Sequence, residues 1–317
     1  KTATFDGALG TTVSLLTDIT IGNLDFSVEN YTIAGSNALI LDSSGTPAIQ
    51  VVSGSTATII ANLAGTLGLE KTGEGTLVLT GLKSYSGGTT VTGGTLELQG
   101  ANSGNAQIHG SLTVSPGATV TFTGGDGTGF GYFNNPVTST TVNGGTINAV
   151  GSSHLGFGPA ATMNLNNGAT ILGNWQWNGD GLLAFSSSGD STNTIGVGSV
   201  TLRADAGVNH TFTVNDGLAA NDLKVDANLT DQFPNPLAPW VVASGLTKAG
   251  AGTMVLNGTN TYDGNTVVND GALEVASTGS LRFRPTTNGA TNAVSGAGSL
   301  SFLGTVDLDL SGTDATG

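Results

Sequence analysis

Two segments of the chain repeat each other without a gap. Residues 68–99 and 245–276 match at about half of their positions. The glycines of the two copies largely coincide, and between them TLVLT (76–80) and TMVLN (253–257) set Leu77 and Leu79 against Met254 and Leu256, with a period of two. Alternation with a period of two is typical of a β-strand, because successive side chains point to opposite faces. Repetition at this spacing favours stacked coils over a fold that closes around one pocket.

Composition also favours an all-β fold. The 317 residues include 51 glycines and no cysteine, 38% are hydrophobic and only 9% are charged. Such a chain is too apolar to be a disordered linker, and it shows no apolar repeat with a period of 3.6. Without disulfides, its stability must come from the core and from backbone hydrogen bonds.

Asn-Gly and Asp-Gly dipeptides punctuate short strands such as TVTFT (119–123), MNL (163–165) and TFTV (211–214). These dipeptides tolerate positive φ and serve hairpins as well as solenoid corners, so an antiparallel β-sandwich is the alternative to a β-solenoid. We favour the solenoid because the repeat is gapless and because aromatic residues make up only 6% of the chain.

The repeat resembles a known family. The succession GLxKxGxGTxVLxG, then Tyr85 or Tyr262 followed by a Gly two positions on, then TxVxxGxLE, is similar to the autotransporter-associated β-strand repeat of bacterial passenger regions. The resemblance implies a right-handed parallel β-helix (β-solenoid) and an extracellular or cell-surface setting, associated with the outer membrane. We expect the two tyrosines to be structural packing residues.

We expect one elongated solenoid over residues 1–317. The segment 228–240, NLTDQFPNPLAPW, is the expected interruption, since its three prolines remove backbone donors that a central strand needs. It is predicted to be a loop insertion just before the second repeat copy.

Charge and the length of the apolar runs argue against two classes of partner, nucleic acid and membrane. The net charge is −14 with only eight Lys and Arg, so the chain cannot assemble a phosphate-binding stripe and nucleic acid is excluded as a ligand. No apolar run approaches the ~20 residues of a membrane-spanning helix, so we expect no membrane insertion of this segment.

Candidates for metal or cofactor binding are weak. His109, His154 and His210 are far apart in sequence, without the spacing of a metal site, and are expected to be isolated. The segment TGGDGTGFG (123–131) has Gly129 where a calcium-binding repeat needs aspartate, so it is expected to be a glycine-rich loop. We predict no cofactor, no metal and no catalytic residue.

Paired carboxylates are the only hint of catalysis. Asp307 and Asp309 share a strand face, and Asp216, Asp222 and Asp226 form a second loose group. Glycoside hydrolysis needs two carboxyl groups about 5–10 Å apart, which leaves a β-helical polysaccharide lyase or hydrolase as a minor alternative. We interpret these acids as solvating groups that discourage edge pairing.

Trp175 and Trp177 form the most distinctive binding candidate. As i, i+2 neighbours in NWQWNGDG (174–181) they project from one face of a strand. Outward, they would form a stacking platform for a glycan; inward, they would fill the core. Arg282 and Arg284 also share a face and are expected to pair with acids on neighbouring coils.

The predicted function is that of a structural or adhesive segment of a bacterial cell-surface or extracellular fibre protein. The chain starts at Lys1 without a signal peptide, which is typical of a mature or excised segment. Its ends carry ordinary sequence, so we expect further repeats of a longer chain, or another copy, to stack on them. A glycan-binding adhesin that recognises a glycan or host-surface receptor through Trp175 and Trp177 is the alternative.

Overall fold

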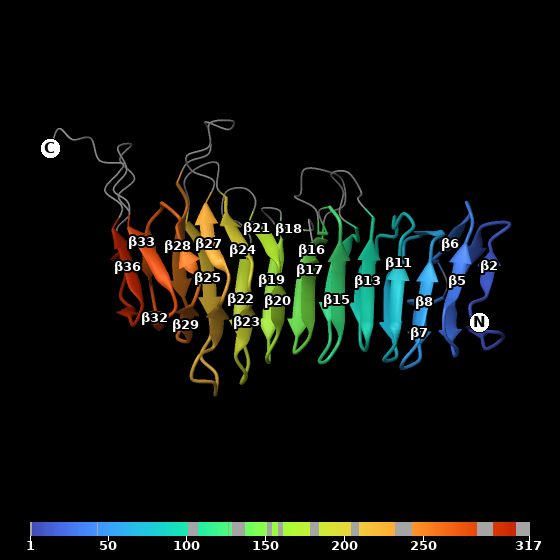
Figure 1. Ribbon diagram of the computed structural model, residues 1–317, viewed down its shortest axis with the longest axis horizontal. Coiled ribbons are helices and arrows are strands. Elements are labelled where there is room, and N and C mark those ends of the chain that lie inside the picture. The colour runs from blue at the N-terminus through green and yellow to red at the C-terminus, as the bar shows by residue number, and fades with distance from the viewer. Residues whose placement is uncertain are drawn as a thin grey trace. The chain divides into compact units, whose positions relative to one another are not determined.

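The computed structural model describes residues 2–42, 44–100, 107–125, 127–128, 137–150, 154–157, 161–177, 184–203, 209–231, 243–283 and 294–308. Within these ranges every regular element is a β-strand (Figure 1). The chain divides into two compact units, Lys1–Gly156 and Phe157–Gly317. Each unit is built in the same way and is described by itself.

Unit 1 has three strand layers; the chain visits all three in turn up to β9, and from β10 to β17 its described strands alternate between the first two. The first sheet runs in the order β1 (Thr2–Phe5), β4 (Asn23–Phe26), β7 (Ala48–Val51), β10 (Leu69–Thr72), β12 (Thr89–Val91), β14 (Gly110–Val114) and β16 (Val137–Asn143). The second runs β2 (Thr12–Ser14), β5 (Tyr31–Ala34), β8 (Thr56–Ile59), β11 (Thr76–Leu79), β13 (Thr95–Gln99), β15 (Thr119–Thr123) and β17 (Thr146–Val150). The third runs β3 (Ile19–Thr20), β6 (Ala38–Ile40) and β9 (Asn62–Ala64). β18 (His154–Phe157) contains the boundary between the units.

Unit 2 repeats the scheme. Its first sheet contains β19 (Thr162–Asn166), β22 (Ala184–Ser188), β25 (Asn209–Val214), β28 (Gly245–Ala249), β31 (Thr266–Val268) and β34 (Val294–Ser295). Its second contains β20 (Thr170–Leu172), β23 (Asn193–Ile195), β26 (Leu223–Val225), β29 (Thr253–Leu256), β32 (Ala272–Val275) and β35 (Ser299–Phe302). The third layer is formed by β21 (Asn174–Trp177), β24 (Ser199–Leu202) and β27 (Asn228–Asp231), and further along by β30 (Thr259–Asn260), β33 (Ser280–Phe283) and β36 (Thr305–Leu308).

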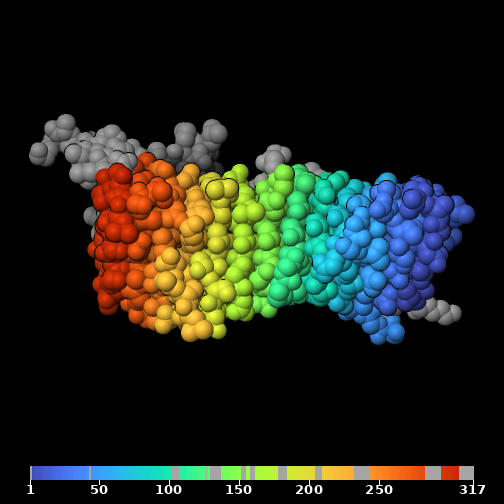
Figure 2. All heavy atoms as spheres, turned by 60° about the horizontal axis from the view of Figure 1, so that its bottom comes forward, coloured from blue at the N-terminus to red at the C-terminus, as the bar shows by residue number. Residues whose placement is uncertain are grey.

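Strand direction distinguishes the two architectures that the sequence allowed, the parallel β-solenoid and the antiparallel β-sandwich. Described strand pairs are parallel, as in Glu70 opposite Thr90 and Thr76 opposite Thr95. Partners lie about one coil apart in sequence, so successive coils form successive colour bands within each unit (Figure 2). The fold is the predicted parallel β-solenoid, and the antiparallel sandwich is excluded.

The two-residue alternation fixes the core. Val120 and Phe122, on β15, are fully buried, while the threonines between and beside them are half-exposed. Met163 and Leu165, and likewise Phe212 and Val214, are buried as their patterns predict. The core of each unit is therefore a stack of inward-facing apolar side chains, one set per coil.

The Asn167-Gly168 pair forms a corner and not a hairpin. Asn167 and Gly168 both have positive φ, 55° and 84°, and they connect β19 to β20, which belong to different sheets. A strand that leaves such a corner pairs with the next coil instead of turning back on its predecessor.

The structure describes only the start of the predicted loop at 228–240, and that start is a strand. Its first four residues form β27, which pairs with β24 in register from Asn228 opposite Ser199. The three prolines lie outside the described residues, so the loop itself stays a prediction, as does the single solenoid over residues 1–317.

Candidate functional site

Trp175 and Trp177 both point into unit 2. They lie on β21, whose side chains alternate, and only 1% and 0% of their surfaces are exposed. Their ring centroids are 5.3 Å apart, with the planes tilted by 33°. A stacking platform for sugars needs exposed ring faces, and the structure instead places both indoles in the core, the second of the two orientations that the sequence allowed.

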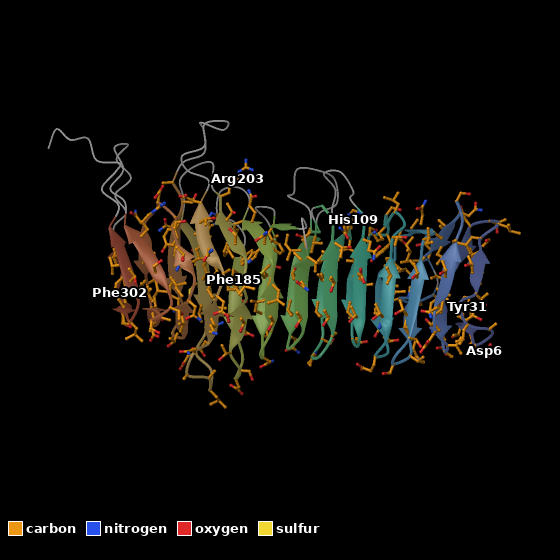
Figure 3. All side chains as sticks on the ribbon, viewed as in Figure 1. Asp6, Tyr31, His109, Phe185, Arg203 and Phe302 are labelled. Atoms are coloured by element: carbon orange, nitrogen blue, oxygen red, sulfur yellow. The ribbon has the colours of Figure 1, made fainter. Side chains whose placement is uncertain are left out.

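The two indoles belong to a larger aromatic cluster. We define this cluster as Phe157, Trp175, Trp177, Phe185, His210 and Phe212. Trp177 lies at its centre, with ring centroids 4.6 Å from Phe212, 5.1 Å from His210 and 5.9 Å from Phe185. Phe185, labelled in Figure 3, packs against Phe212 at 4.9 Å. Edge and tilted contacts of this kind add about 0.5–1.5 kcal/mol per pair beyond area burial.

His210 is the titratable member of the aromatic cluster. It is fully buried, and among the residues that the structure describes neither ring nitrogen has a hydrogen-bond partner with good geometry. Burial lowers the pKa of His210 to about 4, although the backbone of Arg203 acts in the opposite direction. The ring is therefore neutral at pH 7 and works as a flat packing group.

The other two histidines lie elsewhere in the chain. His109 is buried in unit 1, and His154 begins β18, but its side chain lies outside what the structure describes. In the described part of the chain no three His, Cys, Asp or Glu side chains gather as a metal site would require. Of the glycine-rich segment 123–131, only 123–125 and 127–128 are described.

A buried lysine recurs in both repeat copies. The Nζ of Lys71 donates to the carbonyl oxygens of Thr72, Gly73 and Gly93, at 2.9, 2.7 and 3.0 Å. The Nζ of Lys248 donates to Gly250 O at 2.6 Å and Asp270 O at 3.0 Å. Each ammonium thus joins the corner of its own coil to the corner of the next coil.

A third lysine, Lys83, is held in the same manner. Its Nζ donates to Gln99 O at 2.9 Å and lies 3.4 Å from Leu79 O. Burial lowers the pKa of Lys71 and of Lys83 to about 8, with Glu74 opposing the shift at Lys71. Burial also lowers the pKa of Lys248.

Sequence reasoning missed these lysines although a signal was present. Leu69 and Lys71 are i, i+2 neighbours on β10, so the alternation that places Leu69 in the core also places Lys71 there. The same holds for Leu246 and Lys248 on β28. A charged side chain at a core position of both copies indicates a buried hydrogen-bonding role.

The two repeat tyrosines are structural, as predicted. Tyr85 and Tyr262 are fully buried, and each hydroxyl shares a hydrogen bond with a threonine four residues on, Thr89 at 2.6 Å and Thr266 at 2.7 Å. Burial raises the pKa of both phenols. They pack the core and hold the start of the following strand.

Two acids of the second group make hydrogen bonds, Asp222 with the backbone and Asp226 with side chains. Asp222 is buried and accepts the N–H of Gly217 at 2.9 Å and of Thr253 at 2.7 Å. Asp226 accepts Nδ2 of Asn257 at 2.6 Å and contacts Nζ of Lys224 at 3.2 Å. These contacts are structural, and they give neither acid a partner carboxylate.

Of the remaining candidates, two arginines and two aspartates, the structure describes the side chain of Arg282. Arg282 pairs with buried Asp263 at 2.7 Å and also donates to Thr261 O, so the predicted pairing with an acid is confirmed. The side chain of Asp307, and Asp309 and Arg284 altogether, lie outside the described residues. Their roles stay predictions.

The fold and its repeated corner lysine, tyrosine and glycines define a class: a parallel β-solenoid that carries passenger-type repeats. Residues 69–98 and 246–275 match the family model of the Passenger-associated-transport-repeat, which confirms the predicted resemblance. The chain is similar to the BmaC autotransporter adhesin of Brucella suis biovar 1 (strain 1330), with 32% identity over 376 aligned residues. That alignment covers 96% of this chain and 10% of the relative. No solved structure matches the chain significantly.

Over the ranges that the structure describes, no helix has the length and apolar character needed to cross a bilayer.

Proposed function

We propose that this chain is a structural and adhesive, non-enzymatic segment of a bacterial cell-surface protein, displayed outside the outer membrane as one continuous solenoid. The matched repeat is named for passenger proteins, and the relative is an autotransporter adhesin. The chain spans about a tenth of that relative, so the rest of such a protein would supply anchoring and further coils.

One observation carries the structural half of the proposal: core-facing side chains are exposed in the outermost described coils. Ile19 on β3 is 43% exposed, yet it stands in register with Leu39 and, one coil further, Leu63, which are buried. Phe302 on β35, labelled in Figure 3, is 36% exposed opposite buried Val275. Another coil with the same alternation would cover these side chains and pair the open strand edges.

Self-association tests the stacking. Sedimentation velocity over a concentration series should show association of the chain, and Ile19→Asp or Phe302→Asp should weaken it by placing a charge in the contact. Val197→Asp is the matched control, since Val197 is 73% exposed and lies between β23 and β24, outside the outermost described coils. Monomers throughout the series, with no effect of either variant, would contradict end-to-end stacking of copies.

Adhesion is tested on cells. The chain, fused to an outer-membrane anchor on a non-adherent bacterium, should increase the number of bacteria retained on a host-cell monolayer over the anchor alone. Equal retention of the two strains would contradict the adhesive half of the proposal.

A further inference from the structure

Five threonines form one unbroken row on the second sheet of unit 1. We call Thr56, Thr76, Thr95, Thr119 and Thr146 the threonine row. They lie on β8, β11, β13, β15 and β17, which stand side by side in Figure 1, and each is the direct register partner of the next. These four pairings have no register shift, whereas the first sheet shifts between Gly110 and Ser111. The row therefore offers one hydroxyl per coil, roughly every 4.8 Å.

The hydroxyls of the threonine row point outward and are free. The next residue on each strand is buried, namely Ala57, Leu77, Leu96, Val120 and Ile147. None of the five hydroxyls makes a hydrogen bond within the described part of the chain. By contrast, Thr92 donates to Lys71 O at 3.2 Å and Ser186 to Asn164 Oδ1 at 2.7 Å, so these two hydroxyls are used between coils.

The face around the threonine row carries few charges, one of which is exposed Glu74, two residues before Thr76. The neighbouring outward row reads Thr58, Val78, Glu97, Thr121 and Asn148. Its single charge, Glu97, accepts a hydrogen bond from Gln99 Nε2 at 2.7 Å. In a chain of net charge −14, this face is neither a site for a polyanion nor a strongly repulsive surface for a neutral ligand.

We propose that the threonine row binds an uncharged polysaccharide chain that lies along the direction of coil stacking. Each hydroxyl both donates and accepts, which matches sugar hydroxyls, and each threonine methyl gives apolar contact to the carbon face of a sugar ring. A linear ligand meets several weak, equivalent contacts in succession, so avidity replaces a pocket. The inference rests on the proposed adhesive function and names the ligand class for it.

Affinity electrophoresis in native gels tests the ligand class. The gels contain hydroxyethylcellulose, glucomannan or dextran as neutral probes, or carboxymethylcellulose as the anionic probe. We expect at least one neutral polymer to retard the chain and carboxymethylcellulose not to retard it. Retardation by no neutral polymer, or equal retardation by the anionic one, would overturn the proposal.

Substitution tests the row itself. Thr76→Val, Thr95→Val and Thr119→Val combined remove three hydroxyls but keep β-branched shape, and should weaken binding at least tenfold, since each net hydrogen bond contributes about 1 kcal/mol. The matched control combines Thr90→Val, Thr113→Val and Thr141→Val, an aligned set on the first sheet, and should change affinity less than twofold. Equal effects of the two sets, or none from the first, would overturn the assignment.

A single substitution tests the threonine row independently, in case the triple variant does not fold. Thr95→Asp changes one half-exposed position and should abolish retardation by the neutral polymer while circular dichroism stays unchanged. Unaltered retardation would overturn the proposal. The cell-retention assay with the chain displayed on bacteria distinguishes a failure of this inference from a failure of the proposed function. If the bacteria still adhere although the chain binds no polysaccharide, the ligand class is refuted and the adhesive function stands.

Discussion

His210 makes the stability of unit 2 depend on pH. Its pKa is about 4 in the folded chain, because the ring is buried beside Trp177, against 6.5 for an ordinary histidine. The folded chain therefore binds fewer protons than the unfolded chain between these values. Stability from the neutral ring is fully present above pH 6.5 and is lost as the pH falls toward 4.

We predict that His210→Phe removes this pH dependence. Between pH 7 and pH 4.5 the original chain should lose about 2–3 kcal/mol more unfolding free energy than the variant, from the 1.4 kcal/mol that each pKa unit represents. Urea unfolding at the two pH values measures the difference. Carboxylates titrate in both proteins and cancel, so parallel losses would show that His210 is not the group responsible.

Lys71 acts through hydrogen bonds that the backbone cannot make for itself. Lys71→Met keeps a similar length and apolar stem but leaves the carbonyl oxygens of Gly73 and Gly93 without their ammonium donor. The expected cost is about 1–3 kcal/mol of unfolding free energy. Lys224→Met, at a half-exposed lysine beside Asp226, should cost less than about 1 kcal/mol. Equal urea midpoints for the two variants would contradict a structural role for Lys71.

At the scale of the element, strands were predictable from the sequence and their partners were not. TVTFT (119–123) forms β15 with Val120 and Phe122 inward, because alternation is a property of the strand itself. The same alternation placed Trp175 and Trp177 on one face without saying which side faces the core. The burial of Lys71 was missed for a related reason. A charged side chain is expected to be exposed, and only the carbonyl oxygens of the neighbouring coil make its burial favourable.

Glycine corners bring successive coils together at close range. A Cβ on Gly87 would lie 2.2 Å from the backbone nitrogen of Gly68, and a Cβ on the equivalent Gly264 would lie 2.2 Å from the carbonyl carbon of Ser244. The second repeat copy thus has the same restriction as the first. Sequence indicated turns at these glycines, but the approach between coils is a tertiary contact.

Gly87→Ala should therefore destabilise unit 1 by about 1–3 kcal/mol or more, because two backbone segments must separate. Gly45→Ala is the control, since its Cβ would meet no atom within 4 Å. The control should be neutral or slightly stabilising, by up to about 1 kcal/mol. The melting temperatures of the two variants, measured by thermal denaturation, test this prediction. Equal melting temperatures would contradict the close approach of the backbone at Gly87 to that at Gly68.

At the scale of the whole molecule, each coil contacts mainly the coils before and after it. Excision of residues 69–88 joins Gly68 to Thr89, and Thr89 then takes the register position of Leu69, its present partner. The shortened chain should keep its β-sheet circular dichroism and unfold with a smaller urea m-value, since less surface is exposed. A chain that loses its sheet signal would show that the coils do not act as replaceable units.

The parallel ladders also determine how the protein would respond to a pulling force. Their backbone hydrogen bonds point from coil to coil, so tension applied along the stack loads them in series and opens the outermost coil first. Glu70 and Thr90 are register partners, so one opened coil frees about 20 residues, or roughly 70 Å of extended chain. A tether of this kind would lengthen in steps under shear and dissipate energy at each step, before the strain reached its attachment point.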